Sequence, residues 1–72
     1  MKQFNMITMD NLIMALDAKQ NICVWNKDKT LDIPMIDCKV YNLYDCGVDF
    51  SNYLIDDLGI DFSGIRVVIY KK

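Results

Sequence analysis

The chain has 72 residues, of which 53% are hydrophobic and 25% are charged, and its formal net charge at pH 7 is −2. This length is enough for one domain, and the composition is typical of a folded chain and argues against disorder. The longest apolar runs are far shorter than the roughly 20 residues that cross a bilayer, and the first residues do not resemble a secretory leader. We therefore expect a single domain over residues 1–72, located in the cytoplasm.

The first predicted element is a helix over residues 9–17. Its apolar side chains repeat at helical spacing: Met9, Leu12, Ile13 and Leu16. Thr8 is a favourable N-cap, and Asp10 lies near the positive end of the helix dipole. Residues 4–7 fit either a short edge strand or an extended lead-in, because so short an alternation does not distinguish the two.

Two strands are predicted after this helix. Residues 22–25 are a β-branched and aromatic run bounded by polar residues, which indicates a buried strand over residues 21–26. Residues 26–30 are hydrophilic and indicate a turn. The alternation over residues 31–41 then indicates an edge strand, broken or bulged near Pro34 because proline donates no backbone hydrogen bond.

A second helix is predicted at residues 50–58, with Asp49 as its N-cap and Gly59 just beyond its end. Its apolar side chains also follow helical spacing: Phe50, Tyr53, Leu54 and Leu58. Residues 65–70 are apolar on both faces, which indicates an interior strand. The predicted fold class is α+β: a small, mainly antiparallel sheet carries two short helices in the order helix, strand, strand, helix, strand, with residues 4–7 as an optional further strand.

Motifs for catalysis or cofactor binding are not recognisable in the chain. It contains no histidine, so a serine or cysteine nucleophile lacks its usual base. Cys23, Cys38 and Cys46 are odd in number and too far apart for a structural zinc site, and we interpret them as reduced thiols. Some aspartates lie four residues apart and could act as acid and base, but exposed loop carboxylates are the favoured interpretation. We therefore expect no enzymatic activity, no metal and no cofactor.

Residues 40–65 combine negative charge with aromatic side chains. They contain five aspartates and five aromatic residues but no lysine or arginine. The net negative charge disfavours direct binding to nucleic acid, whereas an acidic surface with tyrosines suits a basic protein partner. The alternative is that the aromatic residues belong to the core and the aspartates to a solvated rim. The residues predicted to bind a partner are Tyr44, Asp45, Asp49, Tyr53, Asp56, Asp57 and Asp61.

Several segments together resemble a known group of proteins. Residues 7–12 open a helix with the sequence ITMDNL, residues 22–25 precede a charged turn, residues 39–43 read KVYNL, and the chain ends in an alternating strand. In this pattern the chain resembles very short, mostly uncharacterised proteins of phages and mobile elements in low-GC bacteria. Such small acidic proteins include anti-CRISPR and other anti-defence inhibitors. The resemblance implies action in the host cytoplasm by occluding a host protein.

Two functional hypotheses follow from the sequence. The first is a non-enzymatic inhibitor or modulator, encoded by a phage or mobile element, that binds a basic host protein such as a CRISPR nuclease through the acidic stretch. The second is a homo-oligomeric structural or regulatory module, in which the strand at residues 31–40 pairs across a two-fold axis. Neither hypothesis involves a membrane.

Overall fold

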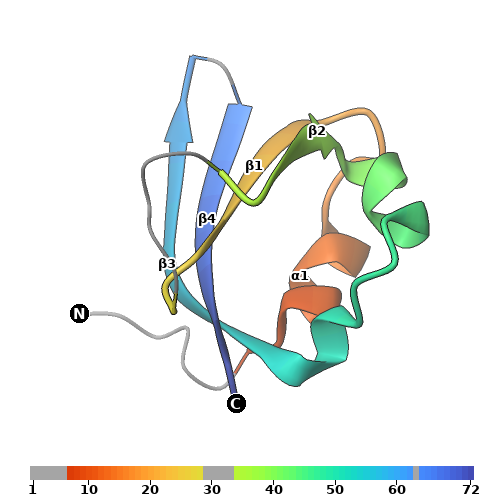
Figure 1. The fold of residues 1–72 in the computed structure, drawn as a ribbon. Coiled ribbons are helices and arrows are strands. Elements are labelled where there is room, and N and C mark those ends of the chain that lie inside the picture. The colour runs from red at the N-terminus through yellow and green to blue at the C-terminus, as the bar shows by residue number, and fades with distance from the viewer. Residues whose placement is uncertain (1–6, 29–33, 63) are drawn as a thin grey trace.

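The computed structural model describes residues 7–28, 34–62 and 64–72, which form one sheet with α1 and two 3-10 helices together on one side of it (Figure 1). The elements in chain order are α1 (Met9–Ala15), β1 (Asn21–Asn26), β2 (Ile36–Lys39), the 3-10 helices η1 (Val40–Asp45) and η2 (Phe50–Asn52), β3 (Tyr53–Asp61) and β4 (Gly64–Lys71). The predicted α+β class is therefore confirmed.

The sheet has four strands in the order β2-β1-β4-β3. The β1–β2 and β3–β4 pairs are antiparallel, whereas β1 and β4 are parallel, so the sheet is mixed. The structure confirms the predicted strand over residues 21–26 and the interior position of residues 65–70. It also confirms an edge strand for residues 36–39. The predicted extension to residue 41 is wrong, because residues 40–41 begin the 3-10 helix η1, and residues 31–33 lie outside the described residues.

One face of the sheet packs against the helices and forms the core. The register aligns Val24 of β1 with Val67 of β4, and Ile55 of β3 with Ile69 of β4, so these side chains share that face. The buried hydrophobic residues are Met9, Ile13, Ile22, Val24, Val40, Leu43, Phe50, Ile55, Val67 and Ile69. The opposite face, which carries Trp25, Asp57, Arg66 and Val68, is called the far face below.

The helix α1 begins where the sequence predicted, with Thr8 as the N-cap residue. The Thr8 side chain donates to the Asp10 carboxylate and does not cap a backbone N–H. The helix ends at Ala15, two residues before the predicted end, because Leu16 already has an extended backbone. Within the described ranges, no helix is long and apolar enough to cross a membrane.

The predicted second helix is wrong, because residues 53–61 form strand β3 and only Phe50–Asn52 are helical. The register of β3 shifts between Ile55 and Asp57, which makes Asp56 the additional residue of a β-bulge. As a result Ile55 and Leu58 both pack against the core although they are three residues apart. A regular strand repeats every two residues and a helix every three or four, so the bulge imitates helical spacing.

The segment at residues 4–7 is described only at Ile7. The Ile7 carbonyl accepts a hydrogen bond of 3.2 Å from the Ile55 N–H, and Thr8 forms an isolated antiparallel bridge with Leu54. The chain therefore touches the outer edge of β3 just before α1 begins. Residues 4–6 lie outside the described residues, so the optional N-terminal strand is not tested.

Gly64 opens β4 in a conformation that other residues rarely adopt. Its φ is +133°, and a Cβ placed there would lie 2.6 Å from the backbone oxygen of Asn21 in β1. The start of β4 therefore fits against β1 only when residue 64 has no side chain.

We expect Gly64→Ala to lower the free energy of unfolding by about 1–3 kcal/mol, because it adds both backbone strain and a backbone clash. Chemical denaturation measures this change. Gly59→Ala is the matched control, since its Cβ would make only an ordinary contact of 3.7 Å with Arg66. Equal destabilisation by the two variants would contradict the explanation.

Candidate functional site

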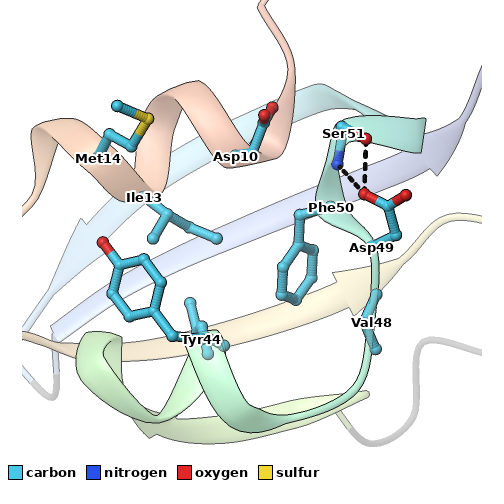
Figure 2. A pocket seen from close by; sticks show the side chains of 9 residues that line it. Asp10, Ile13, Met14, Tyr44, Val48, Asp49, Phe50 and Ser51 are labelled. Carbon is cyan, nitrogen blue, oxygen red and sulfur yellow. Dashed lines mark hydrogen bonds between the residues drawn. The ribbon is translucent and has the colours of Figure 1, made fainter.

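A groove with a volume of about 240 Å³ lies between α1, η1 and η2 (Figure 2). Its lining residues are Asp10, Ile13, Met14, Leu43, Tyr44, Val48, Asp49, Phe50 and Ser51. Ile13, Leu43 and Phe50 are buried and form an apolar floor. Asp10 and Asp49 contribute carboxylates on two different elements (Figure 2). The groove therefore combines an apolar floor with negative charge.

The helix α1 supplies one wall of the groove through its periodicity. Met9 and Ile13 are one helical turn apart and both are buried, so the residue that follows each of them lies at the border of the buried stripe. These border residues are Asp10 and Met14, and the Met14 side chain is 75% exposed. The anchoring of α1 on the sheet thus displays one carboxylate and one flexible apolar side chain.

The 3-10 helix η1 supplies the facing wall in the same way. Val40 and Leu43 are three residues apart, which is one turn of a 3-10 helix, and both are buried. Tyr44 follows Leu43 and is 64% exposed. Figure 2 shows the Tyr44 ring beneath Ile13 and Met14, at the opposite side of the groove from Asp49.

Asp49 is the N-cap of η2, as the sequence predicted, although the helix that follows has only three residues. Its carboxylate accepts hydrogen bonds from the Ser51 hydroxyl at 2.5 Å and from the Ser51 backbone N–H at 3.1 Å (Figure 2). The Asn52 side-chain amide donates a third at 3.2 Å. The Ser51 hydroxyl, followed by the Ser51 N–H, lowers the pKa of Asp49, and Lys72 adds a smaller effect. Asp49 is therefore held in its ionised form and in a fixed position.

The groove includes part of the predicted partner-binding set. Tyr44 and Asp49 line it, and Asp45 is exposed at the end of η1, directly after Tyr44. Tyr53 lies behind the groove, half-buried at the start of β3, with its ring centroid 6.5 Å from that of Phe50. The structure therefore brings three predicted residues together at one surface and places Tyr53 in a supporting position.

The other predicted aspartates lie along β3. Asp56, at the bulge, forms an ion pair of 3.0 Å with Lys27 from the end of β1. Asp57 is exposed on the far face, and Asp61 is the last residue of β3. The acidic stretch is thus divided between two places, the groove and strand β3, and the charge of Asp56 is paired with that of Lys27.

A second hollow, of about 260 Å³, lies on the far face and is lined by Trp25, Asp57, Arg66 and Val68. It contains one negative and one positive side chain, so these two charges offset each other. The indole N–H of Trp25 is buried there and has no hydrogen-bond partner among the described residues. The groove, with two carboxylates among its lining residues, is the better match for a basic partner.

The sequence did not indicate Asp10, Ile13 and Met14 as part of a site, because they lie outside the acidic stretch of residues 40–65. The only available signal was the start of the helix at Thr8 and Asp10. That signal places a carboxylate in the first turn but does not show which later segment faces it.

The arrangement contains no recognisable metal site in the part of the chain that the structure describes. No three side chains of histidine, cysteine, aspartate or glutamate gather there in a group that could hold a metal ion. Of the cysteines, Cys46 is exposed, and Cys23 and Cys38 are half-buried. Burial raises the pKa of the Cys38 thiol, with smaller contributions from Cys46 and Asp37.

No protein-family model matches the chain, and no curated protein and no solved structure is significantly similar to it. The groove, with its residues and charges, is therefore the basis on which a function is inferred.

Asp49 provides a test of the groove's electrostatics. Since its pKa lies below the ordinary value of 3.8, its contribution to stability is fully present above that value and is lost as the pH falls through the lowered pKa. Ser51→Ala removes the hydroxyl hydrogen bond, so we expect the pKa of Asp49 to rise toward its ordinary value. An NMR titration of the Asp49 carboxyl group measures this, and an unchanged pKa in the variant would contradict the assignment.

Proposed function

We propose that the protein is a non-enzymatic binding protein that inhibits or modulates a basic partner protein, and that the groove between α1, η1 and η2 is its contact surface. The observation that supports this proposal is the pairing of an apolar floor with the carboxylates of Asp10 and Asp49 (Figure 2). Lysine and arginine side chains match this arrangement, because each joins an aliphatic stem to a cationic end. The stem would cover the floor while the cation meets a carboxylate.

The exposed side chains around the groove fit a protein contact. Tyr44 offers a large aromatic surface with a polar hydroxyl, a combination that often contributes strongly to binding energy. Met14 is unbranched and adapts to an irregular partner surface. Asp45, exposed beside Tyr44, adds negative charge that speeds the approach of a basic protein. These three side chains extend the contact beyond the groove itself.

The partner we propose is a host defence protein that binds nucleic acid, such as a CRISPR effector nuclease. Proteins of this kind carry clustered cations, since these provide most of their affinity for a phosphate backbone. Carboxylates on a binding protein then occupy the places of phosphates. The resemblance to proteins of phages and mobile elements supports this choice, and so does the acidic sequence pI of about 4.7.

We expect the double variant Asp10→Asn/Asp49→Asn to weaken capture of the partner from a lysate of a low-GC bacterium. Each lost contact should cost about 0.2–1 kcal/mol, the range of exposed ion pairs. Tyr44→Ala should cost about 2 kcal/mol or more if Tyr44 anchors the contact. Binding of the captured protein, once purified, is measured by calorimetry at several salt concentrations, and rising salt should weaken it.

The matched control is Asp17→Asn/Asp37→Asn, which removes the same charge from two exposed positions outside the groove. Asparagine is as good an N-cap as aspartate, so Asp49→Asn keeps η2 while it removes the charge. If both double variants weaken binding equally, net charge and not the groove determines the affinity. If neither does, the proposed contact surface is wrong.

A second candidate function is self-association, which the edge position of β2 favours because an edge strand has unpaired backbone groups. In this case β2 pairs with β2 of a second copy. The N–H of Lys39 faces outward, because the neighbouring Val40 N–H donates to the Gln20 carbonyl on the β1 side. Sedimentation equilibrium over a range of concentrations tests the pairing: a dimer that is lost on Lys39→Pro supports pairing through β2, whereas a monomer at high concentration excludes it.

A further inference from the structure

The groove between α1, η1 and η2 differs at its two ends. Figure 2 shows Asp10 and Asp49 toward one end, and Met14 and Tyr44 toward the other. The Met14 and Tyr44 side chains are 75% and 64% exposed, so a partner can reach both of them. The two ends are called the acidic end and the apolar end below.

The helix α1 fixes the distance between the two ends. Asp10 and Met14 are four residues apart in this helix, so they lie about one turn apart on the same side of it. At a rise of about 1.5 Å per residue, their separation along the helix axis is about 6 Å. The facing wall has the same order, with Asp49 at the acidic end and Tyr44 at the apolar end. The groove therefore offers a negative contact and an apolar contact about 6 Å apart.

An extended peptide segment matches this distance. Its backbone rises about 3.3 Å per residue, and its side chains alternate between two faces. Residues two positions apart therefore share a face at a separation of about 6.6 Å. Neighbouring residues point to opposite faces, and residues four positions apart are separated by about 13 Å. Only the spacing of two positions fits both contacts of the groove.

We propose that the groove selects an extended segment of the basic partner in which a lysine or arginine and a large apolar residue are two positions apart. The cation meets Asp10 and Asp49, and the apolar side chain packs beside Met14 and Tyr44. The proposal deepens the proposed function and rests on it for the site and for the charge of the partner. It adds an uncharged contact and a fixed spacing, which let the groove distinguish basic segments of equal charge.

A helical segment matches the groove less well than an extended one. A helix in a groove is recognised through apolar anchors that repeat over two turns or more. The groove offers one pair of contacts, which corresponds to a single helical turn. A helix of one turn is not stable in a free segment, because its first hydrogen bond fixes several residues.

The difference between the ends also disfavours a second copy that pairs groove to groove. Two copies related by a two-fold axis meet with their ends either matched or reversed. Matched ends place the acidic ends opposite each other, and like charges in contact are unfavourable. Reversed ends bury Asp10 and Asp49 against Met14 and Tyr44, which takes carboxylates out of water without a cation to pair with them. A segment with one cation and one apolar residue has neither cost.

The chain itself has this spacing at two places outside the described residues: Lys2 with Phe4, and Lys29 with Leu31. Near the first, Ile7 and Thr8 run antiparallel to the start of β3. From Thr8 back to Ile7 the chain therefore leads away from η2, which directly precedes β3. Near the second, the Asp28 carboxylate accepts a hydrogen bond of 3.1 Å from the N–H of Lys71, which does not line the groove. Both segments thus adjoin the described structure outside the groove.

The test uses three glycine peptides of equal length, each with one lysine and one phenylalanine, added to isotope-labelled protein and followed by NMR. The two residues are adjacent, two positions apart or four positions apart, so the peptides have the same charge and composition. We expect saturable shifts at the groove amides, and the peptide with the spacing of two should bind about fivefold more tightly than the others. Equal affinities, tightest binding at another spacing, or no saturable shift at millimolar concentrations would overturn the proposal.

Met14→Ala separates the two contacts, and because Met14 is exposed the variant leaves the core intact. We expect it to weaken the peptide with the spacing of two about threefold. A peptide in which glycine replaces the phenylalanine should bind the variant and the wild type equally, since it makes only the charged contact. Asp10→Asn/Asp49→Asn should weaken both peptides. Equal weakening of both peptides by Met14→Ala would contradict the assignment of the apolar end.

Other occupants of the groove give different results. Sedimentation as a dimer that is lost on Met14→Ala would show that a second copy occupies it. Tighter peptide binding after alanine replaces either lysine-containing pair of the chain itself would show that a segment of the same chain does. Either result would overturn the proposal. The variants for the second case are Lys2→Ala/Phe4→Ala and Lys29→Ala/Leu31→Ala.

Failure of this proposal and failure of the proposed function are distinguishable. If capture of the partner depends on Asp10 and Asp49 but the three peptides bind equally, the spacing is wrong and the proposed function stands. If Asp10→Asn/Asp49→Asn changes neither capture nor peptide binding, the groove is not the contact surface and both proposals are wrong.

Discussion

The packing of α1 into the buried core on one face of the sheet is the constraint on which the rest of the structure depends. A chain of 72 residues buries a small fraction of its surface, so few apolar side chains must hold the sheet and helices together. Met9 and Ile13 of α1 belong to the same buried cluster as Val24 of β1 and Val67 of β4. A helix of seven residues is not stable alone in water and forms here because this cluster holds it.

The groove is a consequence of that contact. Burial of Met9 and Ile13 sets the rotation of α1, and this rotation places Asp10 and Met14 beside η1 and η2. Asp49 is fixed independently by the Ser51 hydroxyl and backbone N–H. Because each carboxylate is positioned by its own element, negative charge faces an apolar floor without a salt bridge between the two walls. Side chains that are fixed in this way lose little conformational entropy when they make a contact.

The aspartates of strand β3 lie in surroundings different from those of the groove. Asp56 is the additional residue of the β-bulge, and its carboxylate forms an ion pair with Lys27 at the end of β1. Acidic residues that are adjacent in the sequence therefore have different surroundings, since the groove is formed by helices and β3 belongs to the sheet.

Local signals in the sequence determined much of the fold. The start of α1 follows from Thr8 and the helical spacing of the apolar residues after it, and β1 follows from a β-branched run. The interior position of β4 follows from apolar residues on both of its faces. The N-cap at Asp49 follows from its residue type. Each of these properties depends on residues within one or two turns of the chain. The residue-level chemistry was therefore sufficient to predict them.

Only the tertiary structure decided the rest. Residues 53–58 carry a spacing that suits both a helix and a bulged strand, and pairing with β4 selects the strand. Asp10 and Asp49 are distant in sequence, and only the packing of α1 against η2 brings them to one groove. Spacing along a chain reports which side chains share a face of one element, but it does not report which element that face will meet.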